Sequence, residues 1–205
     1  MCGRHDGAWA QCCRISRQGV AWHDGQFAWA DLPTTLRPPV DHAMPPGTVT
    51  EIHPQGEAFI ASLADRLDRG LVLLIDYGFP EAEYYLPQRH QGTLICHLRH
   101  QVDHDPLTWV GDKDITAHVN FTGIALAAQD AGLDVVGYTS QGRFLLNCGL
   151  MKHLEEASIP AKAHAQKLFT EHEMGELFKV IALSKGLAEG DPLLGFASGD
   201  RTHML

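Results

Sequence analysis

The sequence carries little positive charge and contains no long hydrophobic run. Of its 205 residues, 16 are Lys or Arg and 25 are Asp or Glu, which gives a formal net charge of −9 at pH 7. The basic residues form no cluster, so nucleic-acid binding is not expected. No apolar run is long enough for a membrane-spanning helix. The opening residues MCGRHDGAW lack the apolar segment of a signal peptide, and Cys2 stands where N-myristoylation requires glycine. We therefore expect a cytoplasmic protein without a membrane span.

Several signatures of enzymes and metal sites are also missing. No GxGxxG or Walker motif is present, and Ser140-Gln141-Gly142 is not the GxSxG elbow of a serine hydrolase. The cysteines form no CxxC pair, which argues against a disulfide framework and gives a zinc site little support. Cys96 beside His97 could be a thiol nucleophile, but neighbours in sequence need not pair in space. Reduced thiols, as in a cytosol, are the simplest interpretation of the five cysteines: Cys2, Cys12, Cys13, Cys96 and Cys148.

The stretch from Gly70 to Gly78 is the most informative part of the sequence. Five apolar residues, Leu71 to Ile75, are followed directly by Asp76-Tyr77-Gly78. Such a short continuous run favours a strand buried on both faces of a parallel sheet, with Leu73 almost fully buried. Ligands of open α/β sheets bind beyond the carboxyl ends of the strands, where Asp76 and Tyr77 would lie. Plain termination of the strand is the alternative explanation for these polar residues.

The rest of the chain predicts an α/β fold. An Asp24-Gly25 turn between strand-like runs predicts a β-hairpin over residues 8–31. Residues 51–69 show helical spacing of apolar side chains and end at Gly70, and a helix followed at once by a buried strand is typical of a βαβ unit. We expect one domain over 1–205, with the hairpin as an insertion and an α/β core with helices over 51–205. The other expected elements are helices at 114–131, 141–146 and most of 151–189, strands at 133–138 and 193–196, and a long irregular segment at 79–113.

Two clusters of polar residues could carry chemistry. His97, His100 and His104 have the spacing of one helix face and could bind a metal, but solvated loop histidines would show the same pattern. We favour the second interpretation and expect no bound metal. Asp114 and His118 lie four residues apart in the predicted helix, so the aspartate could orient the histidine as a general base. A capping aspartate with a surface histidine is the alternative.

Four ordered motifs give the chain a family resemblance that extends from about residue 9 to residue 196. Together they resemble the MidA family of S-adenosylmethionine-dependent methyltransferases, which includes a mitochondrial complex I assembly factor that methylates protein arginine. The resemblance implies a partial Rossmann-like methyltransferase sheet with an inserted β-hairpin and helical segments. The motifs are LLIDYG at 73–78, YYLPQRHQGTL at 84–94, GDKDITAHVNF at 111–121 and GYTSQGRFLLNCGL at 137–150.

The resemblance implies S-adenosylmethionine as the methyl donor and an arginine nitrogen of a protein as the acceptor. A respiratory-complex subunit is one such partner that the family suggests. The carboxylates of Asp76 and Asp114 would orient the guanidinium, and His118 would accept a proton. Four further residues would shape the substrate channel: Tyr77, Arg89, Thr93 and Gln141. For Arg89 and Gln141, hydrogen bonds that only hold a loop in place are the alternative role.

The same resemblance predicts how the site is assembled and where this chain departs from the family. We expect Asp76, Tyr77, Arg89, Asp114 and His118 to converge on one cleft at the carboxyl edge of the sheet. Family members are longer at the N-terminal side, where related methyltransferases place their Gly-rich cofactor turn, and the chain resembles only the carboxyl-terminal half to two-thirds. In addition, asparagine stands at position 120, where the family has aspartate.

These departures predict weak cofactor binding by this chain alone. An unpaired strand edge along Leu71 to Ile75 would then favour self-association, or completion by a separate N-terminal half. A non-catalytic interaction or assembly module is the alternative function, and the acidic net charge would suit a basic partner. Titration with S-adenosylmethionine separates these two functions. A metal-dependent hydrolase that uses the histidine-rich segment is a third hypothesis, which metal analysis of the protein would decide.

Overall fold

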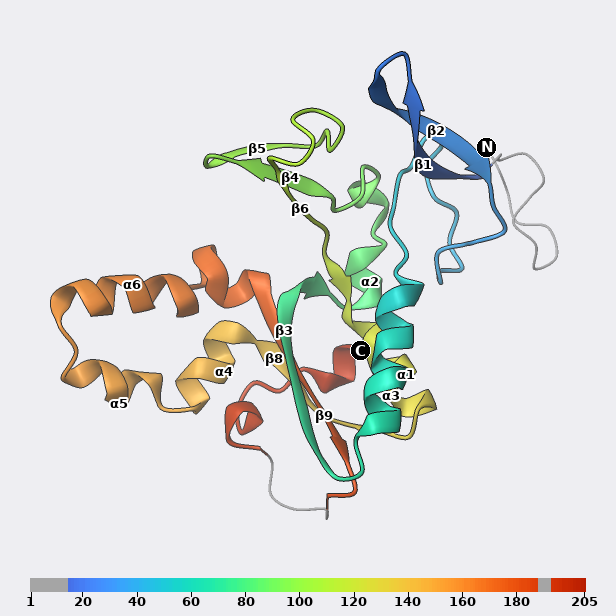
Figure 1. Ribbon diagram of the computed structural model, residues 1–205. Helices are drawn as coiled ribbons and strands as arrows, with labels where there is room; N and C mark the ends of the chain where they lie inside the picture. Colours follow the sequence, from blue (N-terminus) through green and yellow to red (C-terminus); the bar gives the residue numbers. More distant parts are fainter. Residues whose placement is uncertain (1–14, 188–192) are drawn as a thin grey trace. The chain divides into compact units, whose positions relative to one another are not determined.

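The computed structural model describes residues 15–187 and 193–205 (Figure 1). The chain forms two compact units, one made of Met1–Ile52 and Tyr85–Ala117 and the other of His53–Tyr84 and His118–Leu205. Each unit therefore combines segments that lie far apart in the sequence. Residues 8–14 of the predicted hairpin lie outside the described residues.

The first unit contains a β-hairpin formed by β1 (Ser16–His23) and β2 (Gln26–Pro33). The predicted turn between them is confirmed. Asp24 and Gly25 have φ values of 48° and 81°, and positive φ at both central residues is what a type I′ hairpin turn requires. Cross-strand pairing places four exposed apolar side chains on one face of the hairpin: Val20, Trp22, Phe27 and Trp29.

A small antiparallel sheet is the second part of this unit. Its strands are β4 (Ile95–Leu98), β5 (Gln101–Asp103) and β6 (Asp114–Thr116), in the order β5-β4-β6. Arg99 and His100 join β4 to β5 with φ values of 50° and 67°, so a tight two-residue turn again sets the pairing. The prediction of a long irregular segment over 79–113 was therefore wrong, and so was the helix predicted to begin at residue 114.

The second unit is built on a four-stranded sheet with the order β7-β3-β9-β8. Its strands are β3 (Gly70–Phe79), β7 (Val119–Asn120), β8 (Asp134–Ser140) and β9 (Phe178–Lys185). The α/β class predicted from the sequence is confirmed. The expectation of parallel pairing was only partly met, because β9 runs antiparallel to both β3 and β8 while β7 alone pairs with β3 in parallel.

The central strand β9 falls where the sequence predicted helix. Six consecutive residues, Lys179 to Ser184, are buried because β9 is paired on both edges and covered on both faces. A short apolar run of this kind suits a buried strand as well as a buried helix segment, and tertiary pairing decides between them. Residues 193–196 were likewise predicted as a strand, but the 3₁₀ helix η3 (Leu194–Phe196) lies there.

Helices cover the two faces of the sheet unequally. On one face, α1 (Pro54–Arg66) and α3 (Phe121–Asp130) pack on β3, β9 and β8, with Ile60, Phe121 and Ile181 in the core. On the other face, α4 (Gln141–Asn147) and η3 pack on β8 and β9, around Val180 and Phe196. The remaining short helices are α2 (Glu81–Tyr84), η1 (Pro87–Arg89), α5 (Leu150–Glu155), α6 (Ile159–Phe169), a π-helical turn at Glu171–Gly175 and η4 (Thr202–Met204).

The prediction that β3 is buried on both faces was wrong. Val72 and Leu74 pack against the α1 and α3 core, but Leu71, Leu73 and Ile75 are 44%, 40% and 47% exposed. The apolar run correctly indicated a strand, yet no helix in the described part of the chain covers its second face. Within the same described ranges, no helix is long and apolar enough to cross a membrane.

Candidate functional site

Aromatic rings gather at the carboxyl end of β3. The ring of Phe79 stacks on that of His118, with centroids 5.0 Å apart and planes inclined by 11°. The centroid of the Tyr77 ring lies 6.0 Å from that of His118 and 4.0 Å from that of Phe178 in β9. Gly78 allows this arrangement, because a Cβ at this position would lie only 2.2 Å from the carbonyl oxygen of Val119. The chain segment that carries His118 can therefore run directly beside the end of β3.

Hydrogen bonds hold the segment around His118 in place. The hydroxyl of Tyr84 donates to the backbone oxygen of His118 over 3.2 Å. Asn120 caps α3 by accepting from the backbone N–H of Gly123 over 3.2 Å, and its amide donates to Glu81 over 3.2 Å. The asparagine at position 120 thus has a structural role here.

Asp114 and His118 do not share a helix. Asp114 belongs to β6 and pairs directly with His97 of β4, and both side chains are exposed. His118 follows β6 and precedes β7, in the other compact unit. The spacing argument for an oriented general base was wrong, because residues 114–120 are extended and α3 begins only at Phe121.

Asp76 lies beside a buried cationic group at the same end of the sheet. Its exposed carboxylate accepts from the N–H of Tyr77 over 2.7 Å, and its partner in the ladder is Lys179 of β9. Lys179 is only 5% exposed, and its Nζ lies 5.8 Å from the centroid of the Phe79 ring. The ammonium contacts the backbone oxygen of Glu176 and lies 3.3 Å from its carboxylate.

Glu176 joins Lys179 to a second cation, Arg201. The guanidinium donates to both carboxylate oxygens of Glu176, over 2.6 and 3.3 Å. Burial by itself would raise the pKa of Glu176, but the hydrogen bond from Arg201 and the charge of Lys179 outweigh it and lower the pKa. Nearby, the fully buried hydroxyl of Tyr138 has no hydrogen-bond partner among the described residues. Burial first, and the charge of Glu83 second, raise the pKa of Tyr138.

Thr93 and Arg89 belong to the first unit, where a carboxylate organises the chain before β4. Glu51 accepts from the backbone N–H of Thr93 over 2.9 Å, from its hydroxyl over 3.1 Å and from the N–H of Leu94 over 3.1 Å. Gly92 has a φ of 76°, and a Cβ there would lie 2.4 Å from the Glu51 carboxylate. Arg89 ends η1, three residues before this turn. Sequence reasoning missed Glu51, because nothing local marks a residue whose partners lie 42 positions away.

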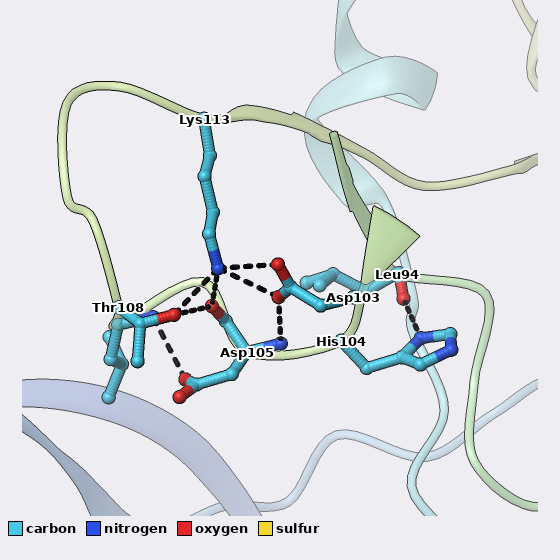
Figure 2. A network of polar contacts seen from close by, with 7 residues as sticks. Leu94, Asp103, His104, Asp105, Thr108 and Lys113 are labelled. Atoms are coloured by element: carbon cyan, nitrogen blue, oxygen red, sulfur yellow. Dashed lines mark hydrogen bonds and ion pairs between the residues drawn. The ribbon is translucent and has the colours of Figure 1, made fainter. Parts of the chain in front are cut away.

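The histidine-rich segment is organised by a lysine (Figure 2). Lys113 Nζ donates to Asp103 over 2.7 Å, to the backbone oxygen of Asp105 over 2.8 Å and to the Thr108 hydroxyl over 2.6 Å. The hydrogen bond from Lys113 is the main reason why the pKa of Asp103 is lowered. The Nδ1 of His104 lies within hydrogen-bond distance of the Leu94 carbonyl oxygen, at 3.0 Å. No group of three metal-ligating side chains occurs in residues 15–187 and 193–205.

Cys96 and Gln141 are both buried. The Cys96 thiol is fully buried in β4, and burial, followed by the charge of Asp103, raises its pKa. A raised pKa disfavours the thiolate that a nucleophilic cysteine needs. Gln141 is the first residue of α4, and its amide donates to the Leu168 carbonyl over 2.8 Å. The bond joins α4 to the end of α6, which is consistent with the alternative role for Gln141, a hydrogen bond that only holds the chain in place.

The structure thus brings some of the predicted site residues together. Asp76 and Tyr77 adjoin each other at the end of β3, and Tyr77 approaches His118. Asp76, Tyr77, His118 and Gln141 belong to the second unit, whereas Arg89, Thr93 and Asp114 belong to the first. Sequence reasoning missed three charged residues beside this end of the sheet, of which only Lys179 is buried, because their partners are set by tertiary structure: Glu176, Lys179 and Arg201.

The comparisons with known proteins identify the family. Residues 4–139 match the family described as "Putative S-adenosyl-L-methionine-dependent methyltransferase", and the chain belongs to this family. It is also similar to the crystal structure of a COG1565 superfamily member from Burkholderia thailandensis bound to S-adenosyl-homocysteine. That chain is 45% identical, with a TM-score of 0.85 over 93% of the present chain and 52% of the relative. The fold is therefore that of a Rossmann-like methyltransferase.

A second structure supports the same relationship. The native crystal structure of a COG1565 superfamily protein from Burkholderia thailandensis is 45% identical, with a TM-score of 0.84, over 93% of this chain and 54% of that one. The present chain thus spans about half the length of these relatives. No curated protein sequence matches it significantly.

Proposed function

We propose that this chain takes part in methyl transfer from S-adenosylmethionine to a nitrogen atom of a protein, with an arginine side chain as the acceptor, as in the MidA family. The proposal is supported by the chain's membership of the methyltransferase family, together with a 45% identical relative bound to S-adenosyl-homocysteine. S-adenosylmethionine supplies a methyl group that is already activated by the sulfonium. The protein then has to position the acceptor and remove one proton.

The carboxyl end of β3 fits part of such a cofactor. The rings of Tyr77 and Phe178 adjoin each other there and are aromatic groups of the kind that attract a sulfonium cation, whereas the Phe79 ring stacks on His118 and has Lys179 Nζ 5.8 Å from its centroid. The sequence has no Gly-rich turn for the adenosine part of the cofactor. The described residues therefore fit the methyl-transferring end of S-adenosylmethionine better than its nucleoside.

The proposed roles of the chain's own residues follow from their chemistry. Asp76 is an exposed carboxylate that can accept two hydrogen bonds from a guanidinium, which would orient and polarise the nitrogen. His118, held by its stack on Phe79, would take the proton that the nitrogen loses. Asp114 is a candidate for a second carboxylate, and Arg89, Thr93 and Gln141 stay candidates for substrate contacts.

The test is methyl transfer by this chain assembled with the part of the Burkholderia thailandensis relative that it does not match. With radiolabelled S-adenosylmethionine and an arginine-rich protein, we expect labelled methylarginine. Asp76→Asn should lower the rate by about 100-fold if the carboxylate orients the acceptor. Asp130→Asn, at the exposed end of α3, is the matched control and should leave the rate unchanged. Labelled lysine, or full activity of Asp76→Asn, would contradict the proposed acceptor or the proposed role.

A non-catalytic interaction module is the second candidate function. It is favoured by the exposed apolar side chains on β3 and on the hairpin. Failure of the assembled protein to bind S-adenosylmethionine would support the module and contradict methyl transfer.

A further inference from the structure

The loop between β5 and β6, residues 104–113, presents a tryptophan to solvent. Trp109 and its neighbour Val110 are 69% and 53% exposed. Trp109 also has a φ of 52°, in the left-handed region that bulky residues rarely adopt. Its carbonyl accepts from the N–H of Asp112 over 3.0 Å, which closes a turn through Gly111. Backbone strain of this kind persists only where surrounding contacts hold it, and it gathers at binding and catalytic sites.

A lysine with a buried side chain holds the 104–113 loop in this conformation. The side chain of Lys113 is only 2% exposed. Its ammonium binds the carboxylate of Asp103, the backbone oxygen of Asp105 and the hydroxyl of Thr108 (Figure 2). Thr108 directly precedes Trp109, so the network reaches the residue beside the exposed ring. A loop that is ordered before binding loses less conformational entropy when a partner docks on it.

Negative charge flanks this tryptophan. The only lysine or arginine between residues 103 and 114 is Lys113, which is already paired with Asp103. Tryptophan is the aromatic side chain best suited to a cation–π contact, and arginine is the more frequent cation in such contacts. Carboxylates beside the ring favour a cation over an anion. Three exposed carboxylates lie within five residues of Trp109 in the sequence: Asp105, Asp112 and Asp114.

We propose that the 104–113 loop is a docking surface for an arginine-bearing segment of a basic protein, with a guanidinium stacked on the ring of Trp109. That this protein is the methyl acceptor rests on the proposed function, whereas binding of arginine by the loop does not. The net charge of −9 adds long-range attraction for such a partner.

A second copy of this chain fits the loop less well. A two-fold interface brings the same surface of both copies together. Asp105 and Asp112 of one copy would then face the same carboxylates of the other, and like charges in an interface oppose association. A basic partner meets no such repulsion.

Peptide binding tests this inference without S-adenosylmethionine. The full 205-residue chain is titrated with a fluorescent peptide of alternating arginine and glycine, and the anisotropy gives the dissociation constant. Trp109→Ala should weaken binding by about tenfold, because the guanidinium loses the ring on which it stacks. Trp22→Ala is the matched control, since Trp22 is 65% exposed in the same unit. It should leave the dissociation constant unchanged within about twofold.

Two further peptides separate stacking from simple charge attraction. A peptide with lysine in place of arginine keeps the charge but lacks the planar group, and it should bind at least about threefold more weakly. A peptide with citrulline keeps the planar group but lacks the charge, and it should not bind at about 1 mM. In the assembled protein of the methyl-transfer test, Trp109→Ala should raise KM for the arginine-rich protein by about tenfold and leave kcat unchanged.

Several results would overturn the inference. Equal binding by wild type and Trp109→Ala, or equal binding of the arginine and lysine peptides, would each do so. Failure of the arginine peptide to bind at about 1 mM would do the same.

Two other results would overturn it by assigning the loop to a different occupant. One is protection of the Trp109 ring from oxidative footprinting once this chain is joined to the part of the Burkholderia thailandensis relative that it does not match. The other is a dimer in light scattering that Trp109→Ala dissolves. Since peptide binding is measured without the methyl donor, failure of this inference and failure of the methyl-transfer proposal are separate outcomes.

Discussion

Replacing Glu51 by alanine should destabilise the first unit by removing the acceptor of a buried turn. The carboxylate accepts from three donors, the N–H and hydroxyl of Thr93 and the N–H of Leu94, over 2.9 to 3.1 Å. Thr93 is only 7% exposed, so water reaches its donors poorly once the carboxylate is gone. A hydrogen bond to a charged group contributes about 1.5–3 kcal/mol. Because the three bonds share one carboxylate that is partly exposed, their contributions do not add in full, and we expect a total loss of about 2–4 kcal/mol, somewhat less than three bonds at the low end would give.

The assay is hydrogen exchange at the amides of Thr93 and Leu94, alongside urea unfolding. Exchange isolates the local effect, since a chain with two compact units need not unfold in one step. Glu51→Gln retains one acceptor oxygen and should lose about half as much free energy as Glu51→Ala. Glu155→Ala, at an exposed position of α5, is the control and should change stability by less than about 0.5 kcal/mol. A loss below about 1 kcal/mol for Glu51→Ala would refute this reasoning.

Three further predictions concern the second unit. Leu73→Ala should lower the free energy of unfolding by about 1 kcal/mol, because the side chain is already 40% exposed. Leu183→Ala, at a fully buried position, should lower it by about 2–5 kcal/mol. Equal losses in urea unfolding would show that β3 is covered on both faces. Tyr138→Phe removes a buried hydroxyl that lacks a partner among the described residues, so it should leave stability unchanged or raise it by about 1 kcal/mol, and a clear loss would reveal a partner. Because the pKa of Glu176 is lowered in the folded protein, its contribution to stability is complete well above the unfolded pKa of about 4.3 and is lost as pH falls from there through the folded pKa. The stability difference between wild type and Glu176→Gln should therefore stay constant from about pH 7 to about pH 5 and shrink below about pH 4.3, and a difference that stays constant into the acid range would argue against the ion pairs.

Local signals in the sequence predicted local structure well. The Asp24-Gly25 turn was predicted correctly, because both residues adopt positive φ readily and the turn sets the register of the two strands. The apolar run from Leu71 to Ile75 correctly indicated a strand. It could not tell whether both faces are covered, since that depends on helices from elsewhere in the chain.

Tertiary contacts account for the errors. Strand β9 was predicted as helix because its short apolar run suits either structure, and only pairing with β3 and β8 selects the strand. The proposed pair of Asp114 and His118 depended on helical spacing, which disappears in the extended residues before α3. The stack of His118 on Phe79 joins residues that lie far apart in the sequence, so no local pattern could reveal it.

Isothermal titration with S-adenosylmethionine tests the central claim most directly. It is carried out on the 205-residue chain alone and on the chain joined to the unmatched part of the Burkholderia thailandensis relative. Since the sequence has no Gly-rich turn for the nucleoside, we expect weak or no binding by the chain alone. The joined polypeptide should bind with a dissociation constant in the micromolar range, about −8 kcal/mol. Absence of binding by a folded joined polypeptide would contradict a role for this chain in S-adenosylmethionine-dependent methyl transfer.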